Sequence, residues 1–103
     1  MTILQIKNFV ESVDPEAKHY FTTLDGNGYT VWAETERTGI RANNALAERG
    51  WKFRIIRYTR DEFEAVAETI ERALDASDVI DYAYTVDCDP ESRYIMHIFE
   101  CEA

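Results

Sequence analysis

The sequence predicts an α+β domain in which two helices pack on one face of a mostly antiparallel sheet. Three observations lead to this fold class. Two amphipathic segments lie far apart in the chain, β-rich runs lie between and after them, and turn residues separate those runs. The expected order is helix, strand, strand, loop, strand, helix, strand, strand. Domains typically have about 100–150 residues, so the 103 residues are expected to form one domain, 1–103.

The first helix is expected to begin after Thr2 and to end before Pro15. Thr2 and Gln5 have the spacing of a capping box, in which each side chain bonds the other residue's backbone amide. The apolar residues that follow recur every three to four positions: Ile6, Phe9, Val10 and Val13. Proline disfavours helical backbone in the residue before it, so Asp14 is expected to close the helix.

The segment from residue 20 to residue 50 is expected to hold a hairpin and then a long connection. Two β-rich runs, 20–24 and 29–33, flank a turn over 25–28 whose glycines supply the positive φ of tight turns. The stretch 34–50 has no clear period and is expected to be an excursion loop that could include a short helix over 43–49. Connections of this length in small domains are more often functional than incidental.

Apolar and basic side chains alternate from Trp51 to Ile55, which predicts a strand with one buried and one solvent-exposed face. Thr59 and Glu62 have the spacing of a second capping box, in front of a helix expected over 60–76. The apolar residues of this helix fall on one side: Phe63, Val66, Ala67, Ile70, Ala73 and Leu74.

The last third is expected to be a hairpin of strands 80–86 and 93–101, with Pro90 in the turn. Cys88 then lies in the turn and Cys101 at the far end of a strand, much further apart than the ~7 Å between Cα atoms that a disulfide allows. We expect two free thiols in a reducing compartment. The first residues lack a continuous apolar segment, so no signal peptide is predicted and the protein is expected to stay in the cytoplasm where it is made.

Charge is distributed unevenly along the chain. The 20 acidic and 11 basic side chains give a net charge of −9, which disfavours a general nucleic-acid binder because phosphate contacts need an excess of Lys and Arg. Residues 1–60 hold 7 acidic and 9 basic side chains, whereas residues 61–103 hold 13 acidic and 2 basic ones. Such asymmetry is typical of an interaction surface, with solubility alone as the alternative cause.

One face of the second helix is expected to carry a row of carboxylates about 20 Å long, at 1.5 Å per residue. The members of this acidic row are Asp61, Glu64, Glu68, Glu71 and Asp75. The row is a solvated face, a surface that meets a basic partner, or an imitation of phosphates. The preceding strand and its end offer charges of the opposite sign: Lys52, Arg54, Arg57 and Arg60. These nine residues are the candidate subunit interface.

No residue pattern is typical of catalysis, of a cofactor site or of a metal site. Neither His19 nor His97 stands at a recognised spacing from a nucleophile or an orienting carboxylate. Gly26 and Gly28 lie in a turn with no helix start behind them to receive a phosphate. Asp87 and Asp89 lack the rest of a calcium loop, and the cysteine and histidine positions do not fit one zinc site. We therefore expect no enzyme activity, no cofactor and no metal.

Taken together, these segments resemble the small tail terminator, or tail completion, proteins of long-tailed bacteriophages and prophages. The strand 51–60, with its aromatic residues and its Tyr58-Thr59-Arg60 end, is followed by a capped helix ending in Ala73-Leu74. Further matching segments are Ala42-Asn43-Asn44, the final strand from Tyr94 to Phe99, the opening helix, and the strand Tyr29-Thr30-Val31-Trp32.

The resemblance implies a structural virion-assembly protein rather than an enzyme. Such proteins form a ring, typically of six subunits, that caps the finished tail tube and offers a docking face to the head connector. The implied partners are further copies of the chain, the tail tube protein and the connector protein, with no direct nucleic-acid or membrane contact. The implied location is the virion tail, after assembly in the host cytoplasm. A closed ring needs a head-to-tail contact, which the basic residues and the acidic row of a neighbour could make.

The alternative function is that of a small acidic protein that imitates DNA. Carboxylates about 5–6 Å apart along a helix approach the ~7 Å spacing of phosphates on one strand, so such a protein can inhibit a host nuclease or defence system. The slightly basic first 60 residues are not expected in a dedicated mimic. A small metabolic or regulatory α+β domain is a third possibility.

Overall fold

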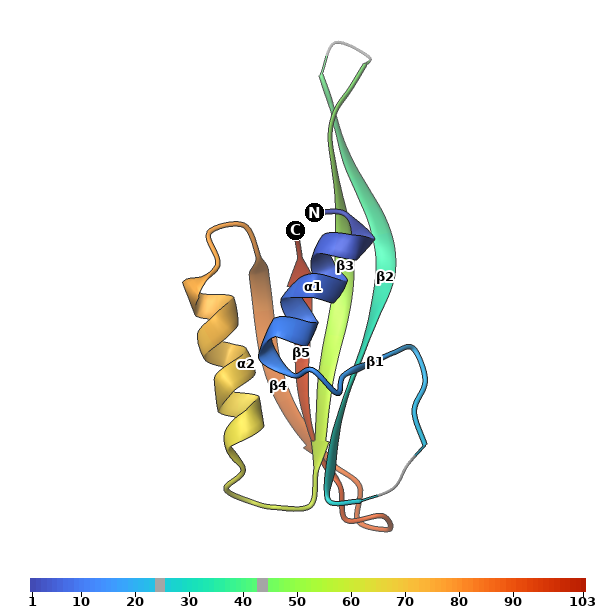
Figure 1. Cartoon of the computed structure of the whole chain (residues 1–103). Coiled ribbons are helices and arrows are strands. Elements are labelled where there is room, and N and C mark those ends of the chain that lie inside the picture. The colour runs from blue at the N-terminus through green and yellow to red at the C-terminus, as the bar shows by residue number, and fades with distance from the viewer. Residues whose placement is uncertain (24–25, 43–44) are drawn as a thin grey trace.

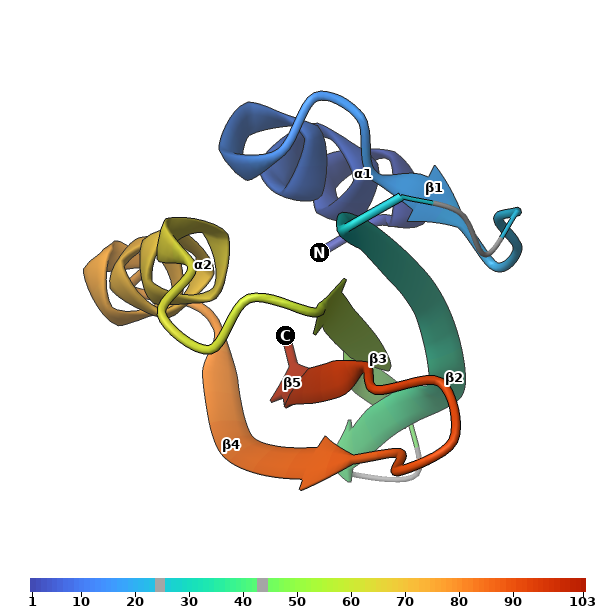
Figure 2. The ribbon, with the colours of Figure 1, turned by 90° about the horizontal axis from the view of Figure 1, so that it is seen from below.

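Both predicted helices form, and both pack on the same face of a curved five-stranded sheet (Figures 1 and 2). The structure is a computed structural model that describes residues 1–23, 26–42 and 45–103. The elements are α1 (Ile3–Val13), β1 (Lys18–His19), β2 (Gly28–Ala42), β3 (Ala45–Thr59), α2 (Ala65–Ala76), β4 (Asp81–Cys88) and β5 (Ile95–Glu102). The sheet order is β1-β2-β3-β5-β4, and every pair except β1 with β2 is antiparallel. The α+β class is confirmed.

Helix α1 begins and ends as the sequence predicts. The Thr2 hydroxyl accepts a hydrogen bond from the Gln5 amide at 3.1 Å, and the Gln5 side chain accepts one from the Thr2 amide at 2.8 Å. These bonds satisfy two backbone amides that a helix start would otherwise leave open. Asp14 is the C-terminal cap, and the buried stripe includes Ile6 and Val10.

Helix α2 begins at Ala65, so the predicted start at residue 60 is wrong. Thr59 is the last residue of β3, and its buried hydroxyl accepts from the Asp61 amide, which makes a turn rather than a helix cap. The N-cap is Glu64, whose carboxylate accepts from the Ala67 amide at 3.1 Å. Phe63 consequently lies before the helix and not on its apolar face.

The predicted hairpin between 20–24 and 29–33 does not form. The chain makes only the short strand β1, which pairs parallel with β2 through Lys18 opposite Val31. Tyr20 then adopts a left-handed backbone with φ 66°, which turns the chain away from the sheet, and residues 20–23 are not in a strand. Leu24 and Asp25 lie outside the described residues.

Residues 34–42 and 45–50 of the expected excursion loop belong instead to two long strands. Both β2 and β3 have 15 residues, and they pair from Gly28 opposite Thr59 to Ala42 opposite Ala45. The short helix expected over 43–49 is absent from 45–49, which belong to β3, while residues 43–44 lie outside the described residues. The two strands extend beyond the helices as an arm (Figure 1), and the molecule is 51 Å long and 25 Å wide.

The core lies between the helices and one side of the sheet, called here the helix-facing side. It contains Trp32 from β2, Phe53 and Ile55 from β3, and Phe99 and Cys101 from β5. The helices contribute Ile6, Val10, Ile70 and Leu74. Alternation in β3 places the odd-numbered residues on this side, as the sequence predicts for Trp51, Phe53 and Ile55. The final hairpin is also confirmed, as β4 with β5.

Candidate interaction surfaces

The opposite side of the sheet, called here the outer face, carries no helix (Figure 2). Its centre is apolar and its side chains are partly exposed: Val31, Ala33, Ile56, Tyr58, Met96 and Ile98. Toward the arm the outer face becomes charged, with an ion pair between Arg54 and Glu100 at 2.6 Å and one between Lys52 and Glu36 at 3.5 Å. An apolar centre with a charged rim is typical of surfaces that contact other proteins.

The four basic candidate residues do not form one continuous surface. Lys52 and Arg54 lie on the outer face, and each pairs with a carboxylate of its own subunit. Arg57 lies on the helix-facing side, because residues 54 and 57 differ in parity along one strand. The Arg60 guanidinium lies 4.3 Å from the ring centre of Tyr94. A single basic patch of the kind expected from the sequence is therefore absent among the described residues.

The acidic row is shorter than the sequence predicts. Asp61 lies before α2, so it is not part of a helical row. Glu64 pairs with Arg57 of the same subunit, and Glu68 pairs with Arg72 one turn later, at 2.6 Å. Asp75 accepts a hydrogen bond from the Tyr82 hydroxyl. The structure thus supplies partners within the chain for most of the row.

A polar group, called here the Arg57 cluster, joins both helices to the sheet. It consists of Arg57 on β3, Glu64 at the start of α2, Asp14 at the end of α1, and Thr30 on β2. Two guanidinium nitrogens of Arg57 donate to Glu64, at 2.6 and 2.9 Å, and a third lies 3.6 Å from Asp14. A Cβ added at Gly28 would lie 2.4 Å from the same guanidinium, so a larger residue there would displace the Arg57 side chain from this position. Bidentate geometry of this kind gives the strongest ion pairs.

His97 lies beside Arg57 on the helix-facing side, in register with it on β5. The Tyr84 hydroxyl is 2.6 Å from His97 Nδ1, an arrangement in which a neutral ring accepts the hydroxyl proton. Burial lowers the pKa of His97 from its usual 6.5, and Arg57 acts in the same direction, while Glu64 opposes it. Burial and the hydrogen-bond geometry therefore favour the neutral imidazole, and the Glu64 carboxylate only partly offsets the effect of burial.

Stability is expected to fall as the pH drops below about 6.5, because the unfolded chain then binds a proton at His97 that the folded chain does not. The melting temperature of the wild type, measured from about pH 7 to about pH 5, should decrease more than that of His97→Gln. His19→Gln is the matched control, because it removes a histidine but should keep the loss of stability at low pH that His97 causes. Equal slopes for the wild type and His97→Gln would show that His97 does not titrate in this way.

The structure also forms a side-chain group that sequence spacing did not indicate. His19 stacks on Trp32 with ring centres 3.9 Å apart, and its Nε2 lies 2.7 Å from a Glu34 carboxylate oxygen. Tyr20 stacks on the other side of the ring, and its hydroxyl bonds the same carboxylate. The 15-residue separation of His19 and Glu34 gives no signal in the sequence, because it depends on the parallel pairing of β1 with β2.

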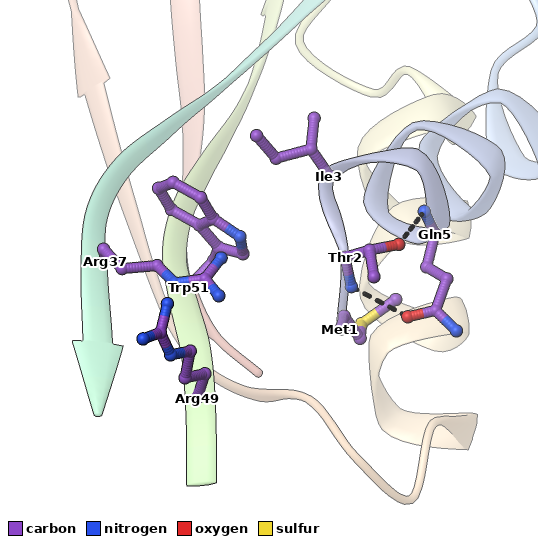
Figure 3. A pocket seen from close by; sticks show the side chains of 7 residues that line it. All are labelled: Met1, Thr2, Ile3, Gln5, Arg37, Arg49 and Trp51. Carbon is purple, nitrogen blue, oxygen red and sulfur yellow. Dashed lines mark hydrogen bonds between the residues drawn. The ribbon is translucent and has the colours of Figure 1, made fainter. Parts of the chain in front are cut away.

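A cavity of about 420 Å³ lies where the arm leaves the body, against the first turn of α1 (Figure 3). Its walls include Arg37, Arg49 and Trp51 on the sheet side and Met1 and Ile3 on the helix side. A register shift between Glu34 and Glu36 in β2 brings Arg37 opposite Trp51, and its guanidinium lies 4.6 Å from the indole centre. Among the described residues, neither arginine forms an ion pair.

The two cysteines are free, as predicted, although Cys88 ends β4 rather than lying in the turn. Cys101 is buried, and burial raises the pKa of its thiol to about 12. We expect one thiol per chain to react with an aromatic disulfide reagent at about pH 8, and the second only after unfolding. Cys88→Ser should abolish the fast reaction, and fast reaction of this variant would contradict the burial of Cys101.

The described part of the chain contains no group of three or more His, Cys, Asp or Glu arranged to hold a metal. Within it, neither helix is long and apolar enough to cross a membrane. No protein-family profile matches the sequence, and no significant relative is found among functionally characterised proteins.

Proposed function

We propose that the protein is a tail terminator of a long-tailed bacteriophage or prophage. In this function it forms a homo-oligomeric ring, caps the finished tail tube and offers a docking face to the head connector. The observation that carries the proposal is the outer face, an apolar sheet surface that the subunit's own helices leave uncovered. Contact with further subunits removes such a surface from water, which stabilises association by about 25 cal/mol per Å² of apolar area buried.

The two edges of the sheet also support a ring. At one edge β1 pairs with only two residues of the 15-residue strand β2. At the other edge β4 ends the sheet order, so its outer hydrogen-bonding groups have no strand partner among the described residues. The edge strands differ in length, because β1 has two residues and β4 has eight. A closed ring is built from contacts between two different surfaces, and these edges are two different surfaces.

The proposed partners are therefore other copies of this chain, the tail tube protein and the head connector protein. The proposed location is the virion tail, assembled in the host cytoplasm. The function requires no enzyme activity, no cofactor, and no direct contact with nucleic acid or membrane.

The alternative of a DNA-mimicking inhibitor has less support. A mimic needs a continuous line of unpaired carboxylates, but Asp61 lies off the helix, Glu64 pairs with Arg57, and Glu68 pairs with Arg72. The shortened row keeps only about two helical turns, which is less than the length of a DNA-like surface. We therefore do not propose this function.

Negative-stain microscopy and native mass spectrometry of the purified chain at high concentration test the proposal. Closed rings, with the mass of six subunits, are expected, and added tail tubes should carry such a ring at one end. A matched pair of variants tests the outer face: Ile56→Asp should abolish assembly, whereas Thr69→Asp on the exposed side of α2 should not. A strict monomer that neither assembles nor binds tubes, and that competes with DNA for a nuclease, would contradict the ring and favour the mimic.

A further inference from the structure

Two sets of charged side chains near the base of the arm form no ion pair with any of the described residues. The basic set is Arg37 and Arg49, which face the cavity at the first turn of α1 (Figure 3). The side chains of both arginines are exposed, and neither has a carboxylate within ion-pair distance among the described residues. The indole of Trp51 holds the Arg37 guanidinium in place by a cation–π contact. The result is a fixed, positively charged site with an apolar wall.

The acidic set is Asp81 and Glu102, which lie directly opposite each other on β4 and β5. Like charges at directly opposed sheet positions are unfavourable. Both side chains are exposed, and no cation lies within ion-pair distance of either in the described chain. Lys52, which is in register with Glu102 on β3, pairs with Glu36 instead. A subunit that keeps this repulsion gains stability when an external cation binds there.

The two sets form no ion pair with each other among the described residues. Arg37 is on β2 and Asp81 is on β4, and the sheet order places β3 and β5 between them. Three strand spacings of about 4.8 Å separate these strands, or roughly 14 Å. Arg49 also borders a second cavity, of about 350 Å³, which Asp81 and Glu102 line, and no ion pair crosses it. Arg37 and Asp81 therefore lie toward opposite edges of the sheet, whereas Arg49 on β3 and Glu102 on β5 lie on neighbouring strands and project from opposite sides of the sheet.

We propose that Arg37 and Arg49 of one subunit bind Asp81 and Glu102 of the next subunit. This inference rests on the ring proposed above and identifies the charged contact that gives its subunits a head-to-tail order. The occupant of the arginine site is thus a second copy of this chain, bringing two carboxylates to two guanidinium groups. Pairing of this kind fixes register and orientation more than it raises affinity.

Charge reversal in two separate variants tests the contact. Arg37→Glu/Arg49→Glu makes the basic set acidic, and Asp81→Lys/Glu102→Lys makes the acidic set basic. Either variant alone is expected to assemble at least tenfold more weakly than the wild type at about 0.1 M salt, because like charges then meet at every junction. An equimolar mixture should recover assembly, since every junction in an alternating ring again joins opposite charges. Such a ring closes only with an even number of subunits.

The controls separate this contact from the ring itself. Glu68→Lys/Glu71→Lys makes the same change in net charge on α2 and should leave assembly intact. Arg37→Gln/Arg49→Gln provides a milder loss of the basic set should the reversal impair folding, which circular dichroism monitors. If the wild type forms rings and both reversed variants do so equally well, the proposed charged contact is wrong, but the proposed ring is not contradicted. If the wild type stays monomeric with and without tail tubes, both are wrong.

Discussion

Replacement of Phe53 with alanine is expected to lower the free energy of unfolding by about 3–5 kcal/mol. The Phe53 side chain has 0% exposure and lies in the central strand, with Cys101 of β5 and Glu34 of β2 on either side. The substitution removes a ring from the layer between the sheet and both helices, and the surrounding residues can fill the space only in part. Domains of this size have a total stability of about 5–15 kcal/mol, so the variant should lose a large part of its stability and unfold at a clearly lower urea concentration than the wild type.

Urea denaturation followed by far-ultraviolet circular dichroism measures this effect. Phe63→Ala is the matched control, because it removes the same ring from a side chain that is 94% exposed. Its effect should lie within about 0.5 kcal/mol of the wild type. The comparison also tests where α2 begins, since a helix from residue 60 would place Phe63 in the core. A large loss from Phe63→Ala, or a small one from Phe53→Ala, would contradict the described packing.

Local patterns in the sequence predicted the helices and the final hairpin well. The capping box of Thr2 and Gln5 and the alternation of β4 and β5 depend on neighbours a few residues apart, which sequence periodicity records. The start of α2 was not predictable in this way. Glu64 becomes its cap because Arg57, seven residues earlier on β3, holds the same carboxylate. The capping spacing of Thr59 and Glu62 was therefore outweighed by a contact between elements.

The arm shows a second limit of sequence patterns. Residues 34–50 contain glycine, charged residues and small apolar residues without a regular alternation, because register shifts occur between Glu34 and Glu36 and between Ile40 and Arg41. A register shift moves the following side chains to the other face and erases the period-two pattern. Backbone pairing with β3 still keeps the segment extended. The shift between Glu34 and Glu36 also places Arg37 opposite Trp51, and both residues line the cavity.

Charge asymmetry along the sequence is partly neutralised where the two halves of the chain meet. The sheet order keeps β1, β2 and β3 on one side and β5 and β4 on the other, so the halves meet where the slightly basic strand β3 pairs with the acidic strand β5. Arg54 and Arg57 are neutralised by Glu100 and Glu64 across that boundary. The charges relevant to assembly are consequently those left over after pairing, which only the three-dimensional arrangement identifies.

Arg57→Met is expected to lower the free energy of unfolding by about 3–5 kcal/mol, because it leaves two carboxylates without their cation. Arg57 and Glu64 are nearly buried, with 12% and 10% of their side chains exposed, and Asp14 at 15% is close to them. Removal of the guanidinium also releases both helix ends that it joins to the sheet. The Arg54–Glu100 pair is the matched control, since both side chains are nearly half exposed. Arg54→Met should cost at most about 1 kcal/mol.

A double-mutant cycle separates the pair itself from the cost of a lone buried charge. Arg57→Met/Glu64→Gln removes both charges, so it should be less destabilised than the sum of the two single variants by about 1–3 kcal/mol. The same cycle on Arg54 and Glu100 should give a coupling of less than about 1 kcal/mol. Equal couplings for the two pairs would mean that burial does not strengthen the Arg57 cluster. The ring proposal would be unaffected, because Arg57 faces the subunit interior and not the surfaces that are expected to meet.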